Sequence, residues 1–309
     1  MNLEDRDGLI WLDGALIPWR EARVHVLSQT LHHGMGAFEG VRAYDGESGV
    51  AVFRLREHTR RLFNSCKIVG LTLPWTPEQI DEACLAVIRA NGYGGCYLRP
   101  VVFLGGENPG VSAAGNSLHA AVIAWPWEDY LGAGAAQRGV RLKVSSFSRH
   151  HHNAVLLKAK ANGLYINSML ANQEARSLGF DDALMLDVSG FVAEASTSNI
   201  FVVRDGEIAT PPRTSVLEGI TRASVITLLA DLGHPVVERH LTRDELYIAD
   251  EAFLTGTASE LTPVSSVDDR PLHACPGPVT LQVQAAFHAA VRGRSRDRLA
   301  WLTPVGPGQ

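Results

Sequence analysis

Apolar positions in the first part of the chain follow two periods, one typical of strands and one typical of helices. Residues 41–45 and 50–53 read as two strands that flank Gly46-Glu47-Ser48-Gly49, a hairpin signal. Residues 57–69 and 77–91 repeat apolar side chains every three or four positions, which predicts two helices. The second helix has signals at both ends, because Thr76 can cap it, Pro77 suits its first position and Gly92 can end it.

The rest of the chain continues to alternate strand-like and helix-like patterns. The strand-like runs are residues 97–104, 118–125, 140–147, 183–187, 191–195 and 199–204, and the helix-like runs are 163–178, 219–233 and 277–291. Thr242 and Glu245 have the spacing of a capping box before one more short helix. Because tight turns such as Asp205-Gly206 join several strands, the pattern predicts an α+β fold with mixed or antiparallel sheets rather than a regular parallel one.

The length of 309 residues favours two domains, at roughly 150 residues each. Residues 131–139, LGAGAAQRG, are small and poor in large side chains, which is typical of a linker. We therefore expect an N-terminal α+β domain at residues 1–130 and a C-terminal α+β domain at residues 140–309. The second domain would then contain Lys158 and Lys160.

Composition and charge exclude several classes of protein. The formal net charge is −5, which argues against a nucleic-acid binder with a basic face. Of the 28 Lys and Arg residues only four are lysines, so amine chemistry has four candidates: Lys67, Lys143, Lys158 and Lys160. The chain has no P-loop motif, since no glycine precedes a lysine, and it has no Gly-x-Ser-x-Gly motif of serine hydrolases.

The sequence shows no signal for secretion or membrane insertion, which favours a cytoplasmic location. We expect no secretory signal in the acidic stretch of residues 1–7 and no membrane span, because no apolar run approaches about 18 residues. The four cysteines lie far apart, which is more typical of reduced thiols in a cytoplasmic protein than of a disulfide framework or a zinc site. His150-His151-His152 suggests metal binding at first, but three adjacent side chains cannot all face one ion, and we expect a loop without metal.

Four segments carry candidate chemistry. Lys158 and Lys160 stand before a helix among small apolar residues, with the phenol of Tyr165 five positions after Lys160. Glu194 ends a strand and precedes Ser196-Thr197-Ser198-Asn199. Gly219-Ile220-Thr221 at a helix start and Thr255-Gly256-Thr257-Ala258 in a turn offer backbone N–H groups that can bind anions.

Each segment also has an ordinary structural interpretation: solvated lysines, an exposed glutamate, a capped helix and a simple turn. Together, however, they provide an amine, a phenol, a carboxylate and two anion-binding cradles. Pyridoxal phosphate needs such a set, because its aldehyde takes a lysine, its ring nitrogen needs an acid partner and its phosphate needs N–H and cationic donors.

At this point the sequence resembles the branched-chain amino acid aminotransferase family, within the fold-type IV enzymes that use pyridoxal phosphate. The resemblance runs from about Leu9 to Trp301. It includes the opening stretch from Val24 through Leu31-His32-His33-Gly34 to Phe38-Glu39-Gly40-Val41-Arg42. Residues 53–62 follow the family pattern, and the four segments described above occur in family order and at family-like spacing.

The resemblance implies a role for each cofactor-binding candidate. Lys160, not Lys158, would be the catalytic residue that forms a Schiff base with pyridoxal 5'-phosphate and moves the proton. Glu194 would pair with the ring nitrogen, and Tyr165 would donate to the phenolic oxygen. Arg61 would hold the phosphate, with help from Ile220, Thr221 and Thr257. The family places its site where the two domains meet and completes it in a homodimer.

The resemblance also implies the substrate and reaction. The substrate-binding candidates are Phe38, Gly40, Arg42, Tyr97, Arg99, Trp127, Tyr130, Ala258 and His33. Arg99 would receive the distal carboxylate of glutamate, while the backbone N–H groups of Thr257 and Ala258 would receive the α-carboxylate. The implied reaction is ping-pong transamination of leucine, isoleucine and valine with 2-oxoglutarate, by a cytoplasmic homodimer or higher homo-oligomer without nucleic-acid or membrane partners.

Three departures from the family pattern bear on substrate range. His33 stands where a pocket tyrosine is expected, Ala195–Asn199 stand where a Gly-rich stretch is common, and His150–His152 stand where the family is often apolar or proline-containing. A D-amino acid or (R)-amine transaminase, or an aminodeoxychorismate lyase, on the same fold is therefore the alternative. A third possibility is a non-catalytic binding protein, but the presence of Lys160, Glu194 and Arg61 together disfavours it.

Overall fold

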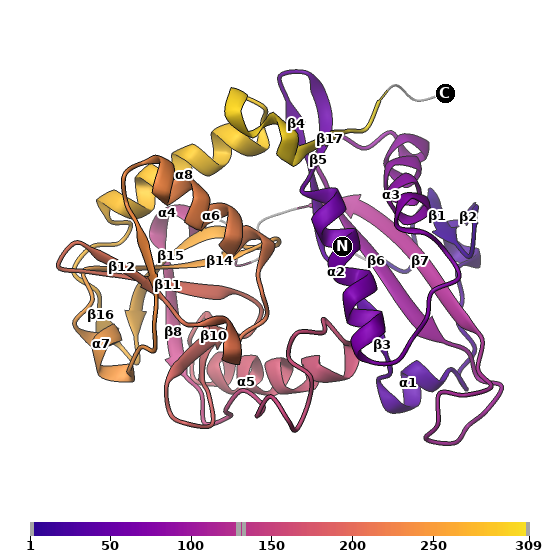
Figure 1. Ribbon diagram of the computed structural model, residues 1–309, viewed down its shortest axis with the longest axis horizontal. Coiled ribbons are helices and arrows are strands. Elements are labelled where there is room, and N and C mark those ends of the chain that lie inside the picture. The colour runs from indigo at the N-terminus through magenta and orange to yellow at the C-terminus, as the bar shows by residue number, and fades with distance from the viewer. Residues whose placement is uncertain (1–2, 128–130, 132–133, 307–309) are drawn as a thin grey trace. The chain divides into compact units, whose positions relative to one another are not determined.

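The computed structural model describes residues 3–127, 131 and 134–306. The chain folds into two compact units (Figure 1). Unit 1 comprises Met1–Trp127, Ala159–Leu164 and Ala289–Gln309, and unit 2 comprises Glu128–Lys158 and Tyr165–His288. Within the described residues, no helix combines the length and the apolar character that crossing a membrane requires.

The described strands of unit 1 form one eight-stranded sheet in which every neighbouring pair is antiparallel. The order is β17-β5-β4-β6-β7-β1-β2, and β3 pairs with β6 off this path. The strands are β1 (Leu9–Leu12), β2 (Ala15–Pro18), β3 (Gly36–Phe38), β4 (Val41–Gly46), β5 (Gly49–Phe53), β6 (Cys96–Leu104), β7 (Leu118–Pro126) and β17 (Leu302–Pro304).

Helices α2 (Leu55–Ile68) and α3 (Pro77–Asn91) pack on one face of this sheet (Figure 1). The core between them is apolar and includes Leu62, Ile88, Leu98 and Val122. Along β6 the even-numbered residues are buried while residues 99, 101 and 103 are only half-buried, so the opposite face carries Arg99 and its neighbours. The shorter helices of unit 1 are η1 (Trp19–Glu21), α1 (Gln29–His33), η2 (Asn162–Leu164) and η4 (Arg296–Trp301).

The described strands of unit 2 form a nine-stranded mixed sheet. The order is β10-β9-β8-β15-β14-β11-β12-β13, with β16 paired to β15, and the pairs β8–β9, β8–β15 and β12–β13 are parallel. The strands are β8 (Val140–Val144), β9 (Asp182–Leu186), β10 (Val192–Ala195), β11 (Asn199–Arg204), β12 (Glu207–Thr210), β13 (Val236–Glu238), β14 (Glu251–Gly256), β15 (Glu260–Val267) and β16 (Arg270–Pro271).

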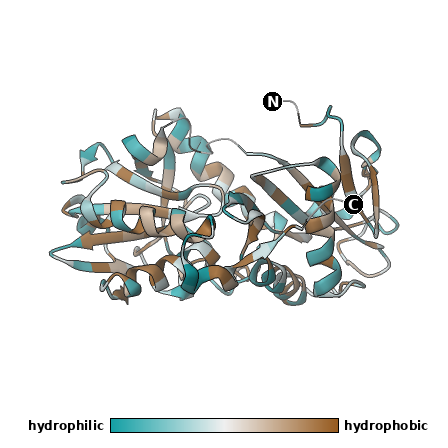
Figure 2. Ribbon diagram, turned by 90° about the horizontal axis from the view of Figure 1, so that it is seen from above, coloured by the Kyte–Doolittle hydropathy of each residue, from teal (hydrophilic) through white to brown (hydrophobic). Residues whose placement is uncertain are grey.

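Helices pack against the strands of this second sheet. α5 (Tyr165–Ser177) contacts β8 and β9, α6 (Ile220–Asp231) contacts β13 and β14, and α4 (Ala135–Arg138) contacts β15. The remaining helices are η3 (Arg213–Ser215), α7 (Arg243–Tyr247) and α8 (Pro278–Val291), the last of which ends in unit 1. Figure 2 shows long hydrophobic stretches along the strands, as expected where a strand is buried on one or both faces.

The α+β prediction with mixed or antiparallel sheets is confirmed, and most predicted elements occur within a few residues of their expected bounds. α3 begins and ends as predicted: Thr76 accepts a hydrogen bond from Gln79 N, and Gly92 closes the helix with φ of 62°. The hairpin between β4 and β5 closes with Gly46 opposite Gly49. The main shortfall is β8, which ends at Val144 rather than at residue 147.

The structure divides the chain differently from the predicted boundaries in two ways. First, the described part of the predicted linker 131–139 contains α4 and a buried Ala135, and it belongs to unit 2. Second, unit 1 includes two segments that were predicted to belong to the C-terminal domain. β17 joins its sheet by pairing with β5, and Ala159–Leu164 hydrogen-bonds to the chain around β3. Lys160 therefore lies in unit 1, contrary to its predicted place in the C-terminal domain.

Candidate active site

The segment around Lys160 is fixed by backbone hydrogen bonds. Phe38 N donates to Lys160 O at 3.0 Å, and Ala37 forms an isolated bridge with Ala161. Lys160 N donates to Ser65 Oγ on α2 at 2.9 Å. Farther along, Gly163 N donates to Gly34 O at 2.9 Å, and a Cβ on Gly34 would lie 2.8 Å from Gly163 Cα. Bonds on both sides of Lys160 thus set the position of its backbone.

The four lysines differ in their surroundings. Lys160 is half-buried, and its Nζ lies 5.0 Å from the centre of the Phe38 ring. Lys158 instead pairs with Glu218 at 3.2 Å, and Lys143 pairs with Asp268 at 2.6 Å. Lys67 is exposed on α2. Lys160 is therefore the lysine whose amine lies against the aromatic side chains that were predicted to bind substrate.

Arg61 is held by a buried carboxylate. Its Nε and Nη2 donate to Glu39 Oε1 at 2.6 Å and Oε2 at 2.9 Å, and His58 Nδ1 lies 2.7 Å from the same Oε2. Burial opposes ionisation of Glu39, but Arg61 and His58 outweigh it and hold the pKa of this carboxyl well below its usual range. Burial lowers the pKa of His58, so a neutral imidazole donates its Nδ1–H to Glu39.

Aromatic rings surround Arg99 on the sheet face of unit 1 opposite α2 and α3. Its guanidinium carbon lies 4.7 Å from the centre of the Phe38 ring, 5.5 Å from that of Tyr97 and 6.0 Å from that of Trp125. Tyr97 also stacks on Trp127 with ring centres 4.4 Å apart. The structure brings together four residues that were predicted to bind substrate: Phe38, Tyr97, Arg99 and Trp127. We call these four residues and Trp125 the aromatic wall.

Gly40 allows this wall to form. A Cβ at residue 40 would lie 1.9 Å from the Tyr97 hydroxyl, so any side chain there would displace Tyr97. Arg42 stands in register with Tyr97 on the neighbouring strand, and its guanidinium lies 4.8 Å from the centre of the Tyr44 ring.

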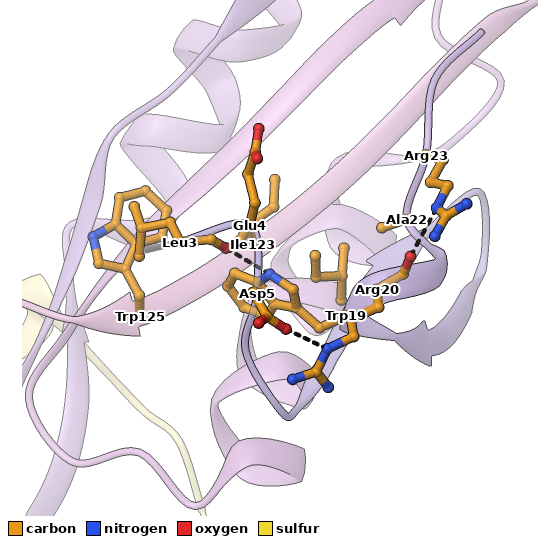
Figure 3. A pocket seen from close by; sticks show the side chains of 10 residues that line it. Leu3, Glu4, Asp5, Trp19, Arg20, Ala22, Arg23, Ile123 and Trp125 are labelled. Carbon is orange, nitrogen blue, oxygen red and sulfur yellow. Dashed lines mark hydrogen bonds and ion pairs between the residues drawn. The ribbon is translucent and has the colours of Figure 1, made fainter. Parts of the chain in front are cut away.

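A pocket of about 650 Å³ adjoins the aromatic wall through Trp125 (Figure 3). Its other walls come from the N-terminal segment, η1 and β7, where Trp19 Nε1 donates to Leu3 O and Arg20 pairs with Asp5. None of the predicted site residues lines it. The pocket is therefore a neighbour of the candidate site rather than the site itself.

In unit 2, Glu194 is a buried carboxylate at the end of β10. Arg149 Nη2 lies 2.8 Å from Oε1, and both side chains are 8% exposed. Asn199 Nδ2 donates to Oε2 at 3.0 Å, and Leu217 N donates to both oxygens at 3.3 Å. The guanidinium and these donors compensate the negative charge of a buried carboxylate, and a protonated ring nitrogen requires such an anion as its partner.

The start of α6 lies beside this carboxylate. Gly219 is the N-cap residue, and because glycine has no side chain it cannot cap the first turn itself. A Cβ at Gly219 would lie 2.0 Å from Asn199 Oδ1, so the glycine lets the helix start approach Asn199 closely. Ile220 and Thr221 are buried in the first turn. Their N–H groups and the helix dipole suit an anion.

A hydroxyl-rich turn follows β14, the strand that pairs with β11. Thr255 pairs in register with Asn199, and Ser198 Oγ lies 2.8 Å from Ser259 Oγ. The hydroxyl of Thr255 is buried and has no hydrogen-bond partner in the described structure. Thr257 and Ala258 lie in the turn itself and are half-buried. Glu194, the α6 start and this turn are therefore neighbours in unit 2.

The remaining predicted residues are placed as follows. Tyr165 is the half-buried first residue of α5. His33 is exposed at the end of α1, next to His32. Tyr130 lies outside the described residues. In the part of the chain that is described, no three His, Cys, Asp or Glu side chains lie together so as to hold a metal ion.

Sequence reasoning missed several residues that organise the site: Glu39, His58, Ser65, Trp125, Arg149 and Asn199. Glu39 had a signal, because it stands between two pocket candidates, Phe38 and Gly40. Asn199 likewise belongs to the turn after Glu194. Arg149 had no such signal in the sequence, because its partner Glu194 is 45 positions away and only the fold brings the two together.

Comparison with known proteins identifies the family. Residues 36–267 match the family of class IV amino-transferases. The branched-chain-amino-acid aminotransferase of Pseudomonas aeruginosa is 50% identical over 306 residues, which cover 99% of this chain and 100% of that protein.

Solved structures agree with the sequence comparison. The T.th. branched-chain amino acid aminotransferase with pyridoxamine 5'-phosphate superposes with a TM-score of 0.94 at 46% identity, over 97% of this chain and 99% of that one. The same enzyme with N-(5'-phosphopyridoxyl)-L-glutamate gives a TM-score of 0.93 at 45% identity, over the same shares of the two chains. The chain therefore belongs to the class IV amino-transferases and, within them, to the branched-chain amino acid aminotransferase family.

Proposed function

We propose that this chain transfers amino groups between the branched-chain L-amino acids and 2-oxoglutarate, with pyridoxal 5'-phosphate as cofactor. One observation carries the proposal furthest: the amine of Lys160 and the guanidinium of Arg99 both lie against the ring of Phe38, at 5.0 and 4.7 Å from its centre. A reactive amine, an apolar ring and a carboxylate receptor are thus adjacent, as an enzyme for both apolar and acidic amino acids requires.

The residues in each unit fit the cofactor. In unit 2, the carboxylate of Glu194 suits the ring nitrogen, and the first turn of α6 with the turn at Thr257 suits the phosphate. Tyr165 would donate to the phenolic oxygen of the cofactor. In unit 1, Lys160 would hold the cofactor covalently through Nζ, and Arg61 would bind the phosphate. When bound, pyridoxal phosphate supplies an electrophilic aldehyde and a ring that withdraws electrons from the substrate α-carbon.

The chain's own residues then move the proton and orient the substrate. The amine of Lys160 would act as the general base that takes the proton from the substrate α-carbon and as the acid that gives it back later in the reaction. The N–H groups of Thr257 and Ala258 would hold the α-carboxylate. In the first half-reaction the amino acid leaves as its 2-oxo acid, and in the second 2-oxoglutarate takes the amino group.

Arg99 and the aromatic wall explain how one site can serve two kinds of side chain. Leucine, isoleucine and valine would pack on Phe38, Tyr97 and Trp127, which give apolar area without a polar group left unpaired. The distal carboxylate of glutamate or 2-oxoglutarate would pair with Arg99, whose planar fork matches a carboxylate. The same wall therefore binds donor and acceptor in turn.

The active form in this proposal is a homodimer. Four apolar side chains on and before α1 are strongly exposed in the single chain: Val24 at 53%, Val26 at 68%, Leu27 at 49% and Leu31 at 69%. An exposed apolar patch of this kind is typical of a surface that another protein covers. The exposed His33 belongs to the same stretch and would reach the partner's site. We also propose a cytoplasmic location, which the free thiols of the four cysteines support.

A donor and acceptor panel tests the function. With 2-oxoglutarate as acceptor, we expect glutamate formation from L-leucine, L-isoleucine and L-valine, and little from D-alanine or (R)-1-phenylethylamine. An Arg99→Met variant should lose about 100-fold or more in kcat/KM for 2-oxoglutarate, because the distal carboxylate of this substrate would lose its charged partner. The kcat/KM for leucine should fall far less. Absence of activity with leucine would refute the proposal, and pyruvate release from aminodeoxychorismate would favour the lyase.

A further inference from the structure

We propose that Glu39 is a positioning residue, which fixes the guanidinium of Arg61 in the orientation that receives the cofactor phosphate. The inference rests on the proposed function, because it takes Arg61 as the phosphate-binding residue of unit 1. It assigns to Glu39 a role that is exerted only through Arg61.

The geometry of the pair sets the plane of the guanidinium. Nε and Nη2 of Arg61 reach the two oxygens of Glu39 at 2.6 and 2.9 Å. Two parallel hydrogen bonds of this kind prevent the planar guanidinium from rotating relative to the carboxylate. One edge of the guanidinium therefore faces Glu39, and the direction of the Nη1 donors on the other side follows from the position of the carboxylate.

Glu39 is itself held rigidly. Its side chain is fully buried, its N–H donates to Pro100 O at 2.8 Å, and its Oε2 lies within reach of His58 Nδ1 at 2.7 Å and of Gly40 N at 3.3 Å. The backbone of Glu39 is thus anchored to Pro100, and its carboxylate has partners in Gly40 N and His58 besides Arg61, so it cannot follow a displaced arginine. The arginine must instead adapt to the carboxylate.

The sequence position of Glu39 connects this pair to the rest of the site. It lies between Phe38, whose N–H donates to Lys160 O at 3.0 Å, and Gly40, which leaves room for the Tyr97 hydroxyl. Its partners His58 and Arg61 are three positions apart on α2, so they share one helix face. Ser65, four positions after Arg61 on that face, accepts from Lys160 N.

The charges explain why an ionised glutamate is required. With His58 neutral, Glu39 and Arg61 carry opposite single charges, so the pair is balanced without the cofactor. An amide in place of the carboxylate has one oxygen acceptor and one NH₂ group, and the NH₂ would oppose an N–H of Arg61. Glu39→Gln should therefore release Arg61 from its orientation, although the side chain is almost the same size.

The competing explanation is that Glu39 only stabilises unit 1. A purely structural role would weaken binding of every form of the cofactor alike. A role through Arg61 should weaken only the binding that depends on the phosphate. Pyridoxal, which lacks the phosphate, separates the two explanations.

The test titrates full-length protein stripped of cofactor with pyridoxal 5'-phosphate and, separately, with pyridoxal, following tryptophan fluorescence. The proteins are the wild type, Glu39→Gln, Arg61→Met, the double variant, and Glu47→Gln as a control at an exposed carboxylate. Thermal unfolding of each cofactor-free protein shows whether it is folded. Should Glu39→Gln fail to fold, Glu39→Asp, which keeps the charge but shortens the reach, replaces it.

We expect Glu39→Gln to raise the Kd for pyridoxal phosphate by about 10- to 100-fold and to change the Kd for pyridoxal by less than about twofold. In the Arg61→Met background the same change should have no further effect. Equal losses for both ligands, or additive losses in the double variant, would overturn the inference. If the wild type binds no pyridoxal phosphate, the proposed function itself fails.

Discussion

Two of the buried carboxylates, Glu39 and Glu194, are each paired with an arginine. Glu39 holds Arg61 in unit 1, and Arg149 holds Glu194 in unit 2. Isolated buried charges are costly, so each carboxylate depends on its cation, and removal of one partner should expose that cost. The sequence indicated Glu194 as a candidate but not Arg149, since ion partners in a fold are set by tertiary structure.

Replacement of Glu194 by Gln should therefore act on stability as well as on activity. The change leaves the guanidinium of Arg149 buried without its anion, which should cost about 3 kcal/mol of unfolding free energy. In the proposed role of Glu194 it should also lower kcat, because a neutral amide would not stabilise a protonated ring nitrogen. Urea denaturation measures the first effect and steady-state kinetics the second.

A double variant separates these two effects. Glu194→Gln with Arg149→Met removes both charges, so most of the stability should return while kcat stays low. Glu207→Gln, which alters a half-exposed ion pair in the same unit, is the control and should change stability by less than about 1 kcal/mol. Recovery of kcat in the double variant would mean that Glu194 does not act on the cofactor.

At the scale of elements, local signals predicted most of the fold. The cap at Thr76 and the glycine at residue 92 bound α3 as expected, and the predicted capping box at Thr242 and Glu245 occurs in α7, because helix ends depend on hydrogen bonds between near neighbours. The glycine hairpin between β4 and β5 is local in the same sense. Elements defined by near neighbours are therefore readable from the sequence.

Elements defined by distant partners were not readable. The Lys160 segment was assigned to the C-terminal domain, yet its hydrogen bonds run to residues more than 90 positions earlier, such as Ser65 and Phe38. Likewise, β17 joins the sheet through β5, some 250 positions away. The predicted linker contains α4, whose Ala135 is buried although the segment is rich in small residues. A local sequence pattern does not indicate which distant residues will pair in the fold.

At the scale of the whole molecule, acid should destabilise the fold through carboxylates that are paired in the native state. Asp268 is the clearest case: it accepts from Lys143 Nζ at 2.6 Å and Tyr247 Oη at 2.7 Å and also pairs with Arg243. Partial burial raises its pKa, but these partners outweigh burial and lower the pKa of Asp268 from 3.8 to about 2. Its ionised form is therefore favoured by folding.

The sign of the pH dependence follows from this shift. Because the folded pKa lies below the unfolded one, Asp268 stabilises the protein fully above about pH 4 and loses this contribution as the pH falls toward 2. Asp268→Asn should lower the unfolding free energy by about 1 kcal/mol at pH 7, since solvent screens its partly exposed cations. Urea denaturation should show that this deficit shrinks between pH 4 and pH 2; a deficit that is constant with pH would contradict the assignment.

The central claim is that Lys160 is the lysine that carries the cofactor. Borohydride reduction of the protein loaded with pyridoxal phosphate, followed by mass mapping of its peptides, tests it directly. Lys160 should carry the phosphopyridoxyl group, and a Lys158→Ala variant should be labelled to the same extent, because Lys158 is paired with Glu218 instead. A label on Lys158, Lys67 or Lys143, or no label on any lysine, would contradict the account.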